Sequence, residues 1–354
     1  MQATLFLQMG LAKPDLTERQ RRILRLVVEA YVTTGQPVGS KGLVERGGMD
    51  VSPSTVRNEF AALEGLGLLT HPHTSAGRVP TERGYRFYAG SVLDRVEARP
   101  GAFPLDLTTV RREVDAALQA TTEMLSRVTR LLALVSAPPL ETTTVRRVEV
   151  LLLQPDAVMI LVITSTGGVT KRVVRYDGPV DPGLATWAGE YLNDRLAGLT
   201  LGSVLLRKRL ADPGLPEQEL RFLETLRPAF GGAAEGEQRL YVGGAAGLLD
   251  DVRDEEFESY RRLLEVLEQR AALLELLRGS LDPRRPFVRV GAELEHPELS
   301  NVALVGAAYG LAHRTLGTVS LLGPVRMDYD KAIRSVHSAA AELSRFVEDV
   351  YEDN

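Results

Sequence analysis

The stretch VSPSTVRNEFAALEGLGLL, residues 51–69, carries the strongest local-structure signals in the chain. Ser52 is a favourable N-cap, and Pro53 suits the first helical position because that position needs no backbone N–H donor. Val51 before the cap and Val56 after it are spaced as a hydrophobic staple. The sequence therefore predicts a helix that begins at Pro53, ends near Leu66 and leads into an apolar strand.

The two sides of this predicted helix differ in chemistry. Val56, Phe60 and Leu63 share one side at about 100° per residue. The opposite side is polar or small and consists of Ser54, Asn58 and Ala61, flanked by Thr55 and Arg57. Arginine pairs bidentately with guanine and asparagine with adenine, so this side is suited to a DNA major groove. A solvated helix face is the alternative.

The neighbouring residues predict a winged helix-turn-helix. One capped helix is expected to start at Thr17, and a short second helix near Ser40. Residues 71–81, HPHTSAGRVPT, place a turn with Pro and Gly between two short strands, which is typical of a wing. Arg78 is expected to project from this wing toward a minor groove or a phosphate. Thr81 caps a fourth helix.

Metal and thiol chemistry are not expected. The chain has no cysteine, which excludes disulfides, thiolate zinc sites and cysteine nucleophiles, and it has five histidines. His71 and His73 in the wing could be metal ligands, but no acidic partner is near them in the sequence. We therefore expect neither a metal nor a cofactor.

Several motifs, in the same order and spacing, resemble the HrcA family of heat-inducible transcription repressors. They are PVGSK (37–41), STVRNE (54–59), LEGLGLL (63–69), HTSAGRVPT (73–81), VGAE (290–293) and GPVRMDY (323–329). The family usually has Thr at the position of Val325 and often Met at that of Phe60. The resemblance covers about residues 15–350.

The resemblance implies a homodimeric repressor that binds an inverted-repeat operator in double-stranded DNA upstream of chaperone genes. It also implies that heat inactivates the repressor and that the chaperonin keeps it active. The expected DNA-binding residues are Lys41, Ser54, Thr55, Arg57, Asn58, Thr74, Ser75 and Arg78. The alternatives are a metabolite-responsive regulator, and an enzyme with an appended winged helix.

The expected fold is α+β and multidomain, with an N-terminal winged helix-turn-helix, a GAF-like α/β domain and an inserted dimerisation domain. Strands are predicted at 148–153, 157–164, 169–176, 287–294, 301–309 and 317–322, and heptad-spaced helices at 110–135, 257–274 and 329–350. Since each group of strands is short of strands for a stable core of its own, one sheet with an insertion is preferred. The expected divisions are an extension (1–15), the winged helix (16–95), a linker (96–104), a GAF-like domain in two segments (105–198 and 276–354) and the insert (199–275).

Enzymatic activity is not expected. Glu293, His296, Arg326 and Asp328 are candidate polar groups, but no nucleophile-base spacing or phosphate-binding loop accompanies them. The stretch 323–329 is interpreted instead as a strand-to-helix turn with its own cap.

The net charge by itself does not indicate a DNA-binding protein, but a mildly basic N-terminal segment is compatible with one. The net charge is −5, yet residues 16–95 contain 11 basic and 8 acidic side chains. No apolar run approaches the roughly 20 residues that span a bilayer, and residues 1–10 lack the basic region of a signal peptide. We therefore expect a cytoplasmic location and no membrane partner.

Overall fold

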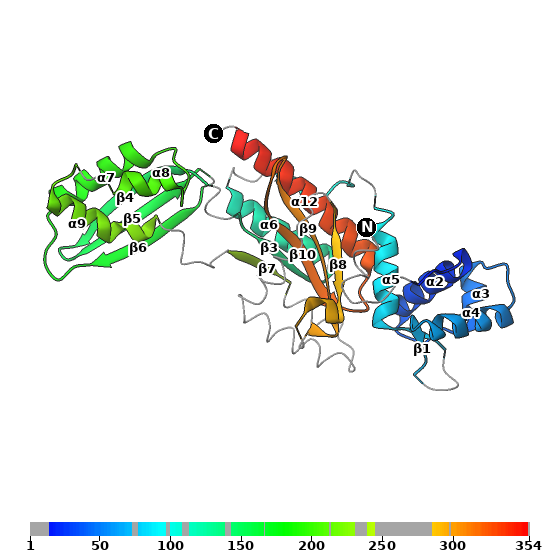
Figure 1. Cartoon of the computed structure of the whole chain (residues 1–354). Helices are drawn as coiled ribbons and strands as arrows, with labels where there is room; N and C mark the ends of the chain where they lie inside the picture. The colour runs from blue at the N-terminus through cyan, green and yellow to red at the C-terminus, as the bar shows by residue number, and fades with distance from the viewer. Residues whose placement is uncertain are drawn as a thin grey trace.

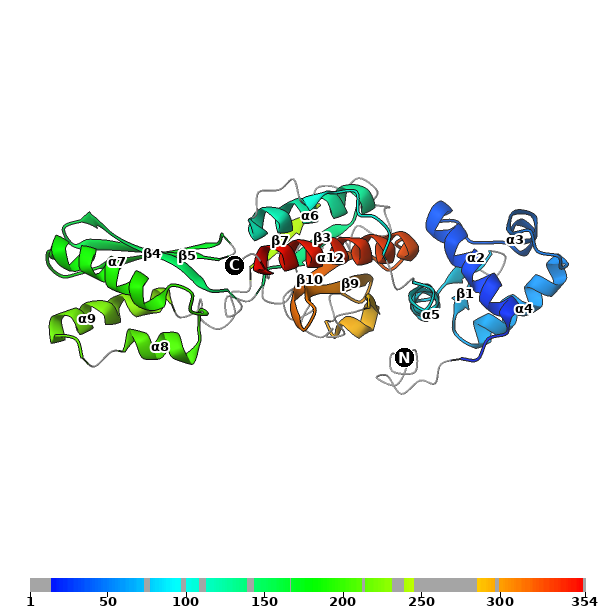
Figure 2. The same cartoon turned by 90° about the horizontal axis from the view of Figure 1, so that it is seen from above.

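The computed structural model describes residues 14–72, 77–96, 100–107, 113–138, 143–165, 167–211, 214–230, 239–244, 285–296 and 299–352. Two views at right angles show three bodies in a row (Figures 1 and 2). The N-terminal head lies at one end, a five-stranded sheet in the middle and a three-stranded sheet at the other end. No described helix is long and apolar enough to cross a membrane.

The head is the predicted winged helix. Its elements are α2 (Glu18–Thr34), α3 (Ser40–Gly47), α4 (Pro53–Gly65), β1 (Leu69–Thr70), β2 (Val79–Pro80) and α5 (Glu82–Leu93). The Ser52 hydroxyl accepts a hydrogen bond from the Thr55 N–H at the start of α4, as its N-cap position predicts. Strands β1 and β2 pair antiparallel and form the base of the wing.

The middle body is a five-stranded antiparallel sheet in the order β7-β3-β10-β9-β8. Its elements are α6 (Val114–Thr129), β3 (Leu132–Ser136), β7 (Leu240–Gly243), β8 (Phe287–Val290), β9 (Val302–Leu311), β10 (Arg314–Pro324) and α12 (Tyr329–Glu352). Helices α6 and α12 pack side by side on the sheet (Figure 1). The hydrophobic core of this body is continuous with that of the head.

The predicted helix over 110–135 is wrong at its C-terminal end. Helix α6 stops at Thr129, and Arg130 adopts a left-handed conformation with φ 58°. The next residues form β3, which is buried along its whole length and pairs with both β10 and β7. Heptad spacing cannot distinguish a helical seam from a short, fully buried strand, and tertiary pairing selects the strand here.

The third body has its own sheet, in the order β4-β5-β6. Its elements are β4 (Val145–Gln154), β5 (Ala157–Thr164), β6 (Val169–Arg175), α7 (Pro182–Leu196), α8 (Val204–Leu210), α9 (Glu217–Leu226) and the 3-10 turn η3 (Arg227–Ala229). The helices cover one face of the sheet and enclose a separate core. This distal body lies between β3 and β7 in the chain, so it interrupts the five-stranded sheet.

The prediction of a single sheet, with an insert over 199–275, is therefore wrong. The single-sheet prediction assigns the strands near 148–176 to the wrong sheet, although the predicted bounds are close to the observed ones. Three strands suffice because α7, α8 and α9 supply the missing half of the core. The distal body, which interrupts the five-stranded sheet, includes residues 143–230 and therefore begins well before the predicted insert at residue 199. The predicted helix over 257–274 lies outside the described residues.

Asn193 on α7 protects the free edge of the distal sheet. Strand β4 is an edge strand, and the Asn193 Oδ1 atom accepts a hydrogen bond of 2.8 Å from the Val148 N–H. The Asn193 Nδ2 atom donates to the Val148 carbonyl and to the Gly189 carbonyl. The side chain thus satisfies both backbone groups of Val148, which would otherwise remain unpaired.

Replacing Asn193 with Ala should destabilise the distal body by about 1–3 kcal/mol, since it leaves partly buried backbone groups unsatisfied. The chain has one tryptophan, Trp187, which lies on α7 and stacks on Tyr191. Its fluorescence during urea unfolding therefore reports on this body. Exposed Asp194, changed to Ala, is the control. An unchanged urea midpoint in Asn193→Ala would show that the edge does not need this amide.

Candidate nucleic-acid interface

Helix α4 presents a polar side to solvent. Ser54, Arg57 and Asn58 are exposed, together with the small residues Ala61 and Ala62. Val56, Phe60 and Leu63 are buried beneath them. Within the described part of the chain, the side chains of Arg57 and Asn58 have no hydrogen-bond or ion-pair partner. Their donors and acceptors are therefore available to base edges.

Three hydroxyl groups cluster at the N-terminus of α4. The Ser52 Oγ atom lies 2.7 Å from Ser54 Oγ and 3.0 Å from Thr55 Oγ1. Thr55 is half-buried, whereas Ser54 is exposed. The first N–H groups of a helix and nearby hydroxyls suit a phosphate oxygen. Lys41, in the first turn of α3, is also exposed and can supply a positive charge to the same backbone.

Glu59 on α4 fixes this helix to α2, a role that sequence reasoning did not identify. The Gln20 Nε2 atom donates a hydrogen bond of 3.1 Å to Glu59 Oε2, and Arg19 forms an ion pair of 3.5 Å with Glu59. Both partners come from the first turn of α2. Glu59 is next to Asn58, so this contact fixes α4 close to its exposed polar side.

Arg78 does not project from the wing as predicted. Its Nη2 atom forms an ion pair of 3.0 Å with Glu64 Oε2 near the end of α4, and its side chain is only 24% exposed. Its backbone pairs with Val38 through two hydrogen bonds of 2.9 Å. The carboxylate of Glu64 attracts the guanidinium inward, so Arg78 anchors the base of the wing rather than reaching outward.

The wing around Arg78 also contains the histidines and hydroxyl residues that the sequence singles out. Glu64 also contacts His71 Nδ1, so the expectation that His71 has no acidic partner is wrong. Thr74, Ser75 and His73 lie outside the described residues. In the described part of the chain, no three His, Asp or Glu side chains gather as metal ligands would.

The polar groups considered for catalysis have structural partners or no catalytic neighbour. Asp328 caps α12 by accepting from the Lys331 N–H, which confirms the predicted strand-to-helix turn. Glu293 forms an ion pair with Arg86. Burial raises the pKa of the Glu293 carboxyl, while the Val290 N–H and Arg86 lower it. The buried Nδ1 atom of His296 has no hydrogen-bond partner among the residues that the structure describes.

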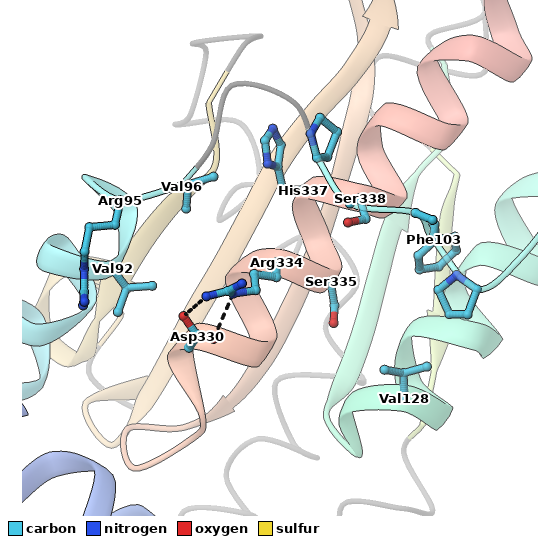
Figure 3. A pocket seen from close by; sticks show the side chains of 14 residues that line it. Val92, Arg95, Val96, Phe103, Val128, Asp330, Arg334, Ser335, His337 and Ser338 are labelled. Atoms are coloured by element: carbon cyan, nitrogen blue, oxygen red, sulfur yellow. Dashed lines mark hydrogen bonds and ion pairs between the residues drawn. The ribbon is translucent and has the colours of Figure 1, made fainter. Parts of the chain in front are cut away.

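A cavity of about 460 Å³ lies between α5, the segment 100–104 and α12 (Figure 3). Val92, Phe103 and Val128 give it an apolar part, and His337 and Ser338 a polar part. Arg334 on its wall is paired with Asp330. Burial lowers the pKa of His337, so the imidazole adds little positive charge near neutral pH. The cavity has a size suitable for an effector, and Arg95, Asp330 and Ser335 also contribute polar side chains to its lining.

Two family matches cover most of the chain. A family described as "Winged helix-turn-helix transcription repressor, HrcA DNA-binding" matches residues 15–92. A second, described as "HrcA protein C terminal domain", matches residues 115–333. The first coincides with the head, and the second spans both sheets.

Curated relatives match over nearly their whole lengths. The heat-inducible transcription repressor HrcA of Acidothermus cellulolyticus is 35% identical, over 94% of this chain and 99% of the relative. The protein of the same name from Parafrankia sp. is 37% identical, over 92% and 97%. A solved structure of a hypothetical protein has a TM-score of 0.62 and 26% identity, over 95% of this chain and 98% of that one.

Replacing Gly77 with Ala should detach the wing. A Cβ atom at Gly77 would lie 2.5–2.7 Å from backbone atoms of Val38, which are held by the pairing with Arg78. Such a clash costs about 1–3 kcal/mol. The amides of Val38 and Arg78 should then exchange hydrogen about tenfold faster or more, measured by mass spectrometry on peptides.

Gly65→Ala is the matched control, because a Cβ atom at Gly65 meets nothing within 4 Å and the residue ends a helix. It should leave exchange at the wing unchanged. Equal exchange rates in Gly77→Ala and the original chain would contradict the close approach of Gly77 to Val38.

Proposed function

Because the chain belongs to the HrcA family of heat-inducible transcription repressors, we propose that it represses as a homodimer bound to an inverted-repeat operator in double-stranded DNA. The observation that carries this proposal is the exposed, unpartnered pair Arg57 and Asn58 on α4. Arg57 reads a guanine and Asn58 an adenine in the major groove. Alanines 61 and 62 let the helix approach the bases closely.

In this proposal the other residues of the head bind the DNA backbone or support the wing, and they do not contact base edges. Lys41, Ser54 and Thr55 contact phosphates, and Arg78 supports the wing through Glu64. Thr74 and Ser75 remain predicted wing contacts. The relatives are named repressors, and we propose that this chain likewise acts as a regulator without catalysis, in the cytoplasm where its DNA lies.

Arg57→Ala and Asn58→Ala should each weaken operator binding by about 1–3 kcal/mol, if each side chain makes a bidentate base contact. Duplexes recovered by selection from a randomised pool serve as probes, and Kd is measured at two salt concentrations. Each substitution should also reduce the preference for a particular base at one position of the half-site. Arg345→Ala, on α12 and far from the head, is the control for loss of one arginine.

If the double variant binds selected and scrambled duplexes as the original chain does, the reading role of α4 is wrong. If the original chain shows no preference for selected over scrambled duplexes, the repressor proposal itself is contradicted.

We propose that the open face of the distal sheet is the dimer contact, which gives the inserted body its function. Helices α7, α8 and α9 cover the other face. On the open face Leu151 is 40%, Val169 58% and Val173 45% exposed. Outward residues of the central strand β5 are also apolar: Met159, Leu161 and Ile163. A second copy of this chain is the occupant that this face fits.

Charge across the open face supports a twofold pairing. Glu149, Leu161 and Lys171 form one cross-strand row over β4, β5 and β6. A twofold axis parallel to β5 would place β4 of one protomer over β6 of its partner. Leu161 then meets the partner's Leu161, and Glu149 faces the partner's Lys171. The same operation would place Leu151 over the partner's Val173.

A charge-swap cycle tests this pairing. Glu149→Lys and Lys171→Glu should each raise the dimer Kd on the order of tenfold, because like charges then face each other. The double variant should recover most of the affinity, measured by sedimentation equilibrium. Arg207→Glu on α8, which is exposed and lies with the helices that cover the opposite face, is the control. Additive losses in the double variant would contradict the proposed axis.

We further propose that the middle body is GAF-like, supported by its five-stranded antiparallel sheet with α6 and α12 against it. We also propose that the operator precedes chaperone genes, that heat separates the two heads and that the chaperonin restores the active form. The apolar open face supports the last point, since heated, dissociated protomers would expose it.

A further inference from the structure

Helix α5 belongs to two bodies at once. It packs against α2 in the head and against β8 and α12 in the middle body (Figure 1). All six residues from Gly84 to Ala89 are buried. A helix that is buried on both sides is a structural part of each body rather than a flexible connection between them.

The contact between α5 and the middle body contains a desolvated cluster of charges. The Arg86 side chain is 8% exposed and forms ion pairs of 2.9 Å with Glu293 Oε1 and 3.0 Å with Glu82 Oε1. Its Nη2 atom also donates to the Val290 carbonyl at 3.2 Å. The pair with Glu82 lies within α5, whereas the ion pair with Glu293 and the hydrogen bond to the Val290 carbonyl cross to the middle body. These two crossing contacts therefore favour one relative orientation of the two bodies.

The two carboxylates extend this cluster across the contact. Glu82, on α5, accepts a hydrogen bond of 3.3 Å from the Ala292 N–H. Glu293 accepts one of 2.9 Å from the Val290 N–H. Gly291 lies against Glu82, and a Cβ atom there would be 2.4–2.7 Å from its carboxylate. The short turn 291–294 therefore lies close against the Glu82 side chain, and Gly291 has a left-handed conformation with φ 55° that favours glycine.

Tyr329, the first residue of α12, adds an aromatic contact to the same joint. Its ring lies 6.2 Å from that of Tyr85 and 6.4 Å from that of Tyr88, centroid to centroid. Its hydroxyl donates to the Val325 carbonyl at 2.7 Å. Tyr329 is fully buried, so α5 cannot move away from the middle body without exposing it.

We propose that this joint, formed by Arg86, Glu82, Glu293 and Tyr329, determines which spacing between operator half-sites the dimer accepts. The inference rests on the proposed dimeric repressor. In that dimer the subunits meet at the distal bodies, and each head is carried by its middle body through α5. One extra base pair moves a half-site by about 3.4 Å and turns it by about 35°. A head held by the buried Arg86–Glu293 ion pair and by the hydrogen bonds to the Val290 carbonyl and the Ala292 N–H cannot follow that displacement at low cost.

The experiment compares spacing preference with half-site recognition. Half-sites recovered by selection are arranged as inverted repeats, and the spacer is changed one base pair at a time over one helical turn, about 10 base pairs. The original chain should prefer one spacer by about tenfold or more over its neighbours. Glu293→Gln, which keeps size and removes charge, should reduce that preference to about threefold or less.

A second variant and two controls keep the result interpretable. Arg86→Lys retains the charge but loses the planar fork, and should also broaden the spacing preference. Both variants should bind a single half-site duplex within about twofold of the original chain, and unchanged circular dichroism shows that they fold. Arg345→Gln, which breaks the exposed pair with Glu342, should keep the sharp preference.

The possible outcomes distinguish failure of this inference from failure of the repressor proposal. Folded Glu293→Gln and Arg86→Lys chains that keep the sharp spacing preference would overturn the role of the joint. An original chain that binds inverted repeats equally at every spacing would also overturn it. An original chain that does not prefer inverted repeats over scrambled duplexes would instead contradict the repressor proposal.

Discussion

The burial of α5 between head and middle body is the constraint on which the rest of the structure depends. The helix starts in contact with the wing, because the Thr81 N–H donates to the Leu68 carbonyl at 3.1 Å. A Cβ atom at Gly84 would lie 2.1 Å from that carbonyl oxygen, so only glycine permits this approach. From there α5 enters the core of the middle body at Tyr85 and Arg86. The wing, the reading helix and the five-stranded sheet are therefore connected through a single element.

The head could be predicted from sequence because its signals are local. The cap at Ser52, the proline after it and the exposed polar side of α4 depend on spacing within one helix. The position of Arg78 could not be predicted in this way. Its partner Glu64 is fourteen residues earlier in the chain, and only the tertiary structure brings the two together at 3.0 Å. The same holds for Glu59, which is tied to Gln20 across two helices.

The two sheets show which features of the fold the hydrophobic periodicity does not specify. Alternation over β4, β5 and β6 predicted the strands well, but it does not specify which strands pair. Two small cores replace the expected single one because α7, α8 and α9 cover three strands by themselves. The strand β3 was missed for a related reason. Its residues are buried on both sides, so they show no alternation that would separate them from the helix before them.

The charge balance of the head explains why such a module needs the rest of the chain. Residues 16–95 hold 11 basic and 8 acidic side chains, and several arginines are engaged internally: Arg19 with Glu59, Arg78 with Glu64 and Arg86 with Glu293. The eight acidic side chains offset most of the eleven basic ones, so sequence-independent attraction to DNA is weak. In the proposed dimer, discrimination then comes from directed contacts by Arg57 and Asn58, and affinity from two heads acting together. Because the second head of such a dimer contributes only where the geometry allows both to engage, the proposal makes the rigidity of the α5 joint as important as the side chains assigned to the bases.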